Sequence, residues 1–135
     1  LGSPEAAPIL IGYLQNQEYQ DVLGVIGETL GKCVDTSHIP ALLECLQNQE
    51  DSGVRCTIIG ILGKIGSSEV VPTLLGRLRS EEWNIRRSIA DALGKIGFDA
   101  LDAICVAWDD YEGEEAQEDL AQVLYTLATI NSDGN

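Results

Sequence analysis

Four arginines and one tryptophan are the residues of this chain best suited to recognising another molecule. Arg77, Arg79, Arg86 and Arg87 are half of its eight basic residues, and Trp83 lies between them. Tryptophan and arginine are enriched among the residues that dominate the binding energy of protein interfaces. The segment therefore predicts a protein-binding site. A second interpretation stays open, in which Trp83 packs on its own helix as a hydrophobic staple.

A charge ladder on one helix is the other way to read this segment. Arg87, Asp91 and Lys95 follow one another at intervals of four residues, which makes their side chains neighbours on a helix surface. As a ladder they would stabilise the helix by a few tenths of a kcal/mol per pair. As a surface they would extend the predicted binding site, together with Lys64.

Residues that commonly carry catalysis or bind metals are few and widely spaced. The only histidine, His38, is expected to be a turn residue near a helix start, and the four cysteines show no CxxC spacing. A nucleophile needs an adjacent base, and a metal site needs several ligands at defined spacing. We therefore expect no catalysis by this chain, and no cofactor or metal.

Negative charge is concentrated at the C-terminal end of the chain. The formal net charge is −14, and residues 96–135 contain ten acidic residues and no basic residue. Such a field disfavours nucleic acid, whose binding depends on lysine and arginine. We expect residues 109–119 to form a long acidic turn, which either faces water as a cap or meets a basic partner surface. The order of acids in residues 109–114 does not match the calcium loop of an EF-hand.

A repeat of about 32 residues sets the elements that must position these side chains. The segment Leu-Gly-Lys begins at Leu30, Leu62 and Leu93, and Pro8 and Pro40 mark the same period. Each unit reads as a short helix opened near a proline, a polar turn and a longer helix. The units are expected at about 3–34, 35–66, 67–97 and 98–131, the last being degenerate. They predict one all-α domain over 1–135, an α-solenoid of four helical hairpins.

Several smaller predictions follow from the register of the repeats. The glycines of Leu-Gly-Lys are expected to let neighbouring helices approach closely, and Gly66 and Gly97 to end helices in the left-handed αL conformation. Three glycines in the first long helix predict that this helix is locally weak. The cysteines divide into two pairs. Cys33 and Cys105 replace Ile or Leu of sister repeats and are expected in the core, whereas Cys45 and Cys56 match arginines and are expected at the surface.

The combination of Ile85-Arg86, then Ala92 to Gly97, then Val71-Pro72 in the repeat pattern resembles the short HEAT-like repeats named after the phycobilisome lyases. The resemblance covers nearly the whole chain. It implies a right-handed superhelix whose second helices line a protein-binding surface, and it implies that Arg55 and Arg86 pair with acids of their own or a neighbouring repeat. Metal-dependent hydroxylases of the wider group carry paired His-Glu motifs, which this chain lacks.

The sequence thus predicts a protein–protein interaction scaffold or regulatory module, whose candidate binding residues are Trp83, Arg86, Arg87, Asp91, Lys95 and Lys64. The alternative implied by the resemblance is an accessory subunit of a phycobilin lyase or a phycobilisome-handling chaperone. We expect a cytoplasmic protein, because no apolar run approaches the length of a membrane span. The lack of methionine and a start in register with the repeat predict a fragment of a longer array, for which self-association is also possible.

Overall fold

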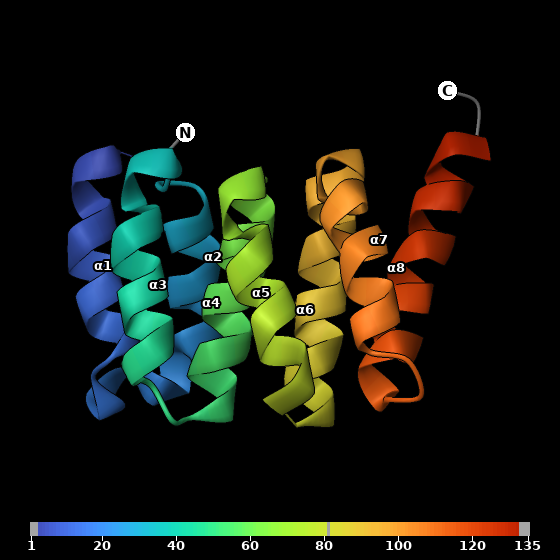
Figure 1. Cartoon of the computed structure of the whole chain (residues 1–135). Coiled ribbons are helices and arrows are strands. Elements are labelled where there is room, and N and C mark those ends of the chain that lie inside the picture. Colours follow the sequence, from blue (N-terminus) through green and yellow to red (C-terminus); the bar gives the residue numbers. More distant parts are fainter. Residues whose placement is uncertain (1–2, 81, 133–135) are drawn as a thin grey trace.

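The computed structural model describes residues 3–80 and 82–132, and within them all regular structure is helical. Four successive α-helical hairpins stand side by side in two layers (Figure 1). The first layer contains α1 (Ala7–Leu14), α3 (Ile39–Asn48), α5 (Val71–Arg77) and α7 (Leu101–Asp110). The second layer contains α2 (Leu23–Gly31), α4 (Ser52–Ile65), α6 (Trp83–Ile96) and α8 (Glu115–Ser132). The predicted all-α solenoid is confirmed.

The helix starts follow the chemistry expected from the repeat. Pro8, Pro40 and Pro72 each lie in the first turn of a first-layer helix, where a missing N–H leaves no bond unmade. At the start of α4, the Oδ1 atom of Asp51 accepts a hydrogen bond of 3.1 Å from the Val54 N–H. Such N-caps satisfy backbone donors that the helix itself cannot pair.

The helix ends show one confirmed and one wrong prediction. Gly66 ends α4 with φ 77° and ψ 16°, in the αL region as expected. Gly97 ends α6 with φ 84° but ψ −147°. This conformation is also difficult for residues other than glycine, but it lies outside αL. It turns the chain directly into the 3-10 segment Gly97–Ala100 that precedes α7.

Each residue of the Leu-Gly-Lys segment lies where the period places it. Leu30, Leu62 and Leu93 are completely buried between the layers, and the three following lysines are exposed. The core is continuous along the array and contains no buried polar or charged residue among those described.

The first long helix is shortened, as its glycines predicted. Helix α2 has nine residues, whereas α4 and α6 each have fourteen. The residues before it, Gln17–Val22, form a 3-10 helix instead of a first α-helical turn. Glycine carries a large backbone entropy cost in a helix, and Gly24 and Gly27 lie in this first half of α2.

Close approach at the repeated glycines is confirmed mainly at one seam, between α4 and α6. A Cβ atom added to Gly63 would lie 2.7 Å from the Cα atom and 2.8 Å from the Cβ atom of Ala92. At Gly31 the nearest atoms belong to the Lys64 side chain, at 3.2 Å, and at Gly94 the nearest is Thr126 Cγ2, at an ordinary 3.6 Å. The small pair Gly63 and Ala92 therefore makes the central seam tight.

Two cysteine predictions are wrong in opposite directions. Cys105 is exposed although its register position is apolar, because α7 is the last first-layer helix among the described residues and none of the described helices covers this side of it. Cys45 is buried although Arg77 occupies its position in the next repeat. A thiol is too short to reach the surface from a site where a long arginine can extend outward. Cys33 is buried and Cys56 is half-buried. In the described part of the chain, no helix is both long and apolar enough to cross a bilayer.

Candidate functional site

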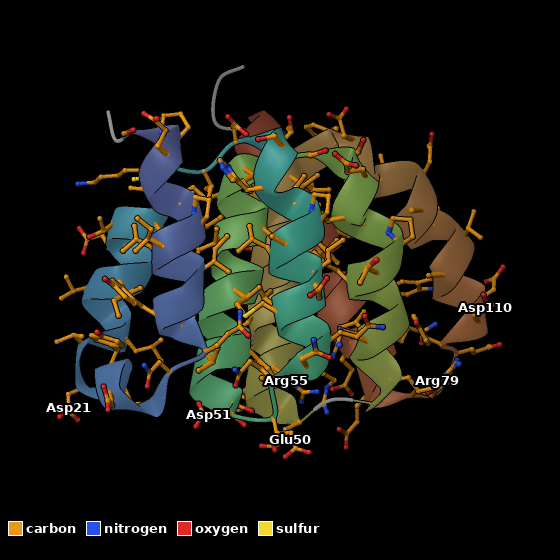
Figure 2. The ribbon with its side chains drawn as sticks, turned by 90° about the vertical axis from the view of Figure 1, so that its left-hand side faces the viewer. Asp21, Glu50, Asp51, Arg55, Arg79 and Asp110 are labelled. Carbon is orange, nitrogen blue, oxygen red and sulfur yellow. The ribbon has the colours of Figure 1, made fainter. Side chains whose placement is uncertain are left out.

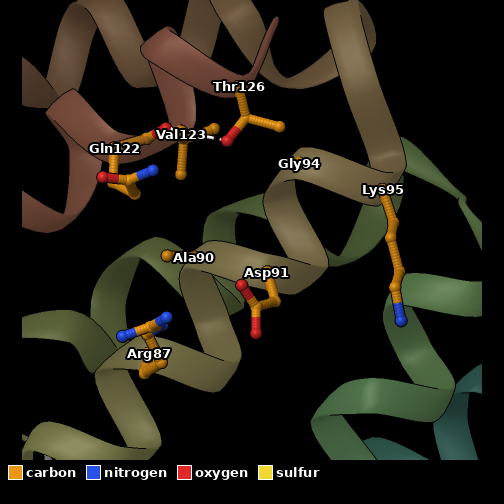
Figure 3. Close-up of a pocket in the computed structure, with 8 residues that line it drawn as sticks. All are labelled: Arg87, Ala90, Asp91, Gly94, Lys95, Gln122, Val123 and Thr126. Carbon is orange, nitrogen blue, oxygen red and sulfur yellow. Dashed lines mark hydrogen bonds between the residues drawn. The ribbon is translucent and has the colours of Figure 1, made fainter. Parts of the chain in front are cut away.

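A groove between α6 and α8 is the clearest concave surface on the second layer (Figure 3). It has a volume of about 450 Å³. Helix α6 contributes five lining residues and α8 contributes three: Arg87, Ala90, Asp91, Gly94 and Lys95, with Gln122, Val123 and Thr126. We call this surface the α6–α8 groove.

The groove opens because the α6–α8 seam lacks the small pair of the central seam. The 31-residue offset between α6 and α8 places Val123 where α6 has Ala92 and Tyr125 where α6 has Gly94. Valine at the contact position keeps the backbones further apart than alanine does. Figure 1 shows α8 leaning away from α6 and α7 towards its C-terminal end. A similar but smaller groove of about 220 Å³ lies between α2 and α4, where this register position holds Ile61.

The floor and rim of the α6–α8 groove differ in chemistry. Ala90 and Val123 form an apolar floor and are 6% and 1% exposed. Arg87 and Lys95 are exposed at the rim, with Asp91 between them along α6. The predicted ladder is not formed, because within the described residues Arg87, Asp91 and Lys95 make no ion pair with one another. Their charges remain available to solvent.

Other candidate residues are distributed around this groove. Lys95 also lines the α2–α4 groove, together with Lys64, whose methylene chain lies over Gly31. Trp83 is the first residue of α6, and its side chain is 65% exposed. The hydrophobic-staple interpretation of Trp83 is therefore wrong. Spacing of four residues puts Trp83 and Arg87 on the same side of α6. Trp83 therefore extends the stripe formed by Arg87, Asp91 and Lys95 beyond the end of the groove.

Arg86 lies apart from the groove and joins two repeats. Its Nη2 atom is 2.8 Å from Glu115 Oε2, and its Nε atom donates to Asp119 Oδ2 at 3.0 Å. The side chain is only 14% exposed. Pairing with acids of a neighbouring repeat is confirmed for Arg86, and this contact fixes the start of α8 against α6.

Arg79 ties the α7–α8 turn to the third hairpin, and Figure 2 shows it beside Asp110 at the edge where the turns lie. Its Nε and Nη2 atoms donate to the two carboxylate oxygens of Glu114, each at 2.9 Å. The guanidinium also lies 4.6 Å from the ring centre of Tyr111, whose hydroxyl donates to the Leu75 carbonyl oxygen. We call these contacts the turn clamp.

The turn clamp shifts the pKa values of Arg79 and Glu114. Hydrogen bonding to Arg79 lowers the pKa of Glu114, and the same bond raises the pKa of Arg79. Such charge-assisted, two-pronged pairs are more specific in geometry than single contacts.

The acidic turn is shorter than predicted and is partly used inside the protein. Helix α7 continues to Asp110 and α8 begins at Glu115, so residues 111–114 alone connect them. Gly113, with φ 80°, allows this reversal. Glu114, Glu115 and Asp119 bind arginines of the third hairpin. Among the described residues, no cluster of three or more potential metal ligands is present.

His38 occupies a structural turn, as predicted. Its Nδ1 atom accepts a hydrogen bond of 3.0 Å from the Asp35 N–H, and Asp35 in turn caps the backbone at Ser37. The Ser37 hydrogen bonds lower the pKa of Asp35.

The α8 side of the groove was missed by the sequence analysis. Gln122, Val123 and Thr126 belong to the degenerate repeat, which has neither the proline nor Leu-Gly-Lys to mark its register. The signal that could have found them is the 31-residue offset of the buried positions, which carries Ile89 onto Leu120 and Ile96 onto Leu127.

Comparison with known proteins identifies one family whose sequence pattern matches this chain. A protein-family model described as HEAT repeats matches residues 39–125, which is more than half of the chain. The matched region runs from α3 into α8 and contains every residue that lines the α6–α8 groove except Thr126. A search of curated proteins found no match.

Proposed function

This chain belongs to the HEAT-repeat family, and on that basis we propose that it is a protein–protein interaction module with no catalysis of its own. The partner is another protein or a domain attached to the array, and it contacts the surface of the second-layer helices. Stacked hairpins typically serve as extended binding surfaces.

The α6–α8 groove is the observation that carries this proposal. It combines a buried apolar floor at Ala90 and Val123 with a rim of exposed charges at Arg87 and Lys95. An apolar centre surrounded by polar groups is the usual anatomy of a protein interface. Trp83, at the start of the same stripe, adds an exposed aromatic side chain of the type that anchors interfaces.

The acidic fourth hairpin is a second contact surface in this proposal. Acids such as Asp102, Glu112 and Glu118 are exposed, and a basic surface of the same partner would meet them. An electrostatic contact of this kind mainly accelerates association.

A pull-down from the source cell with a blocked groove tests the proposal. Gln122→Trp places a large side chain in the α6–α8 groove, and Gln47→Trp places the same side chain on an exposed site of α3. A bound protein should be lost with Gln122→Trp and with Trp83→Ala, and retained with Gln47→Trp. Binding that is indifferent to both Gln122→Trp and Trp83→Ala would contradict the proposed surface.

A role with phycobilin lyases or phycobilisomes stays a prediction, as does a cytoplasmic location, because the matching model describes HEAT repeats in general. Mixing the protein with a linear tetrapyrrole tests the pigment role directly. An unchanged visible absorption spectrum, with and without candidate lyase subunits, would remove it.

A further inference from the structure

The basic residues divide into two groups that lie in different places. Four take part in interactions with other residues of the protein: Arg55, Arg77, Arg79 and Arg86. The other four are exposed and make no ion pair within the described part of the chain: Lys32, Lys64, Arg87 and Lys95. All four of these belong to second-layer helices or their ends. The available positive charge of a strongly acidic chain is thus gathered on one layer.

Two of these charges stand near opposite ends of the α6–α8 groove. Arg87 and Lys95 are eight residues apart on α6, which corresponds to about 12 Å along the helix axis. Both line the groove (Figure 3). Asp91 lies between them along α6, and the apolar Ala90 and Val123 lie on the side that faces α8. Lysines in the last turn of α4 and α6 also complement the helix dipole. That effect does not explain Arg87, which lies in the first half of its helix.

We infer that the α6–α8 groove binds an acidic segment of a partner protein, with one carboxylate at Arg87, a second at Lys95 and an apolar side chain between them. This inference rests on the proposed function and names the chemistry of its partner. An arginine can hold a carboxylate with two parallel hydrogen bonds, and an apolar residue would cover Ala90 and Val123. Asp91, between the two bases, requires the middle of the segment to be uncharged.

The overall negative charge of the chain does not oppose such a contact at short range. At physiological ionic strength, exposed charges further apart than about 8 Å are largely screened. The segment therefore experiences mainly the charges that line the groove. Asp91 is the one carboxylate among the groove residues, so the lining carries a net charge of +1 from Arg87, Lys95 and Asp91.

Fluorescence anisotropy with a designed peptide tests this inference. The probe is fluorescein-labelled Ser-Glu-Ser-Leu-Ser-Glu-Ser, whose two glutamates are about 13 Å apart in an extended chain. Its control carries glutamine in place of both glutamates. The protein variant Arg87→Gln/Lys95→Gln removes both rim charges. The matched variant Gln15→Glu/Gln47→Glu changes the net charge by the same amount at the edge of the array where the hairpin turns lie, away from the groove.

The acidic probe should bind about tenfold more tightly than its glutamine control, as expected for two exposed charge pairs. The preference should disappear with Arg87→Gln/Lys95→Gln and persist with Gln15→Glu/Gln47→Glu. Equal binding of the two probes, absence of binding by either at millimolar protein, or equal losses in the two variants would overturn the inference.

The same variants separate this inference from the proposed function. If the natural partner is lost with Gln122→Trp but retained with Arg87→Gln/Lys95→Gln, the groove is an interface and the acidic chemistry is wrong. If binding of the natural partner is retained in all of these variants, the groove is not its binding surface and both proposals fail.

Discussion

Adding a single methyl group at Gly63 should destabilise the protein, although alanine is the better helix former. In Gly63→Ala the new Cβ atom would lie 2.7 Å from the Cα atom of Ala92 and 2.8 Å from its Cβ atom. Carbon atoms normally pack at about 3.5–4.0 Å. Because one of the two atoms belongs to the backbone, no side-chain rotation can relieve the contact, and α4 and α6 must move apart.

The expected magnitude is the balance of two effects. Replacing glycine by alanine inside a helix gains about 1 kcal/mol, and overpacking a tight contact costs about 1–3 kcal/mol. With a backbone atom in the contact we take the upper value, which gives a net loss of about 2 kcal/mol in the free energy of unfolding. Gly60→Ala, in the same helix, meets no atom within 4 Å and should instead stabilise the protein by about 1 kcal/mol.

Urea unfolding followed by far-ultraviolet circular dichroism measures both variants against the parent protein. For a chain of this size, with a denaturant slope of about 2 kcal/mol per M, Gly63→Ala should lower the midpoint by about 1 M. Gly60→Ala should raise it by about 0.5 M on the same slope. If the two variants shift the midpoint equally, the α4–α6 seam is not closely packed and the explanation given for the grooves on either side fails with it.

Three further predictions concern the turn clamp, the thiols and a helix cap. Since Arg79 lowers the pKa of Glu114 from its ordinary value of 4.5, the clamp adds stability above that value and loses it as the pH falls through the lower folded-state pKa. In urea unfolding, Glu114→Gln should therefore be less stable than the parent at neutral pH and equal to it at about pH 2. A difference in stability that does not change with pH would contradict the pairing. Cys105 is exposed, whereas burial raises the pKa of Cys45, so a short iodoacetamide pulse read by mass spectrometry should label Cys105 first, and equal labelling would show that Cys45 is accessible. Asp51→Ala should lower the free energy of unfolding in urea by about 1 kcal/mol, and Asp51→Asn should lower it much less. Equal stability of Asp51→Ala and the parent would show that the cap at the start of α4 does not stabilise the protein.

The sequence was most informative where each repeat has a neighbour on both sides. Leu62 and Leu93 lie at positions that every hairpin must bury to stack, so their period alone predicted the core. Cys105 was misplaced by the same reasoning, since register matching assumes a following hairpin to cover it. The position of Cys45 was misread because a short thiol and a long arginine reach different depths from the same backbone site.

The candidate site could be predicted on α6 but not on α8. Spacing of four residues was sufficient to put Arg87, Asp91 and Lys95 on one side of a helix. It could not show whether they pair with one another, which depends on side-chain conformation. The α8 side of the groove depends on the distance between α6 and α8. Val123 helps to set this distance, but in the sequence it is one apolar residue among many.

The unequal seams between second-layer helices also affect how the array opens and closes. In a solenoid, stability is approximately the sum of the stabilities of the repeats and of the interfaces between neighbours. The tight contact of Gly63 with Ala92 joins the second and third hairpins, whereas α2 is short and α8 leans outward. Among the described hairpins, we therefore expect local opening to involve α2 and α8 first and α4 and α6 last. Amide protons of α4 and α6 should accordingly be the slowest to exchange.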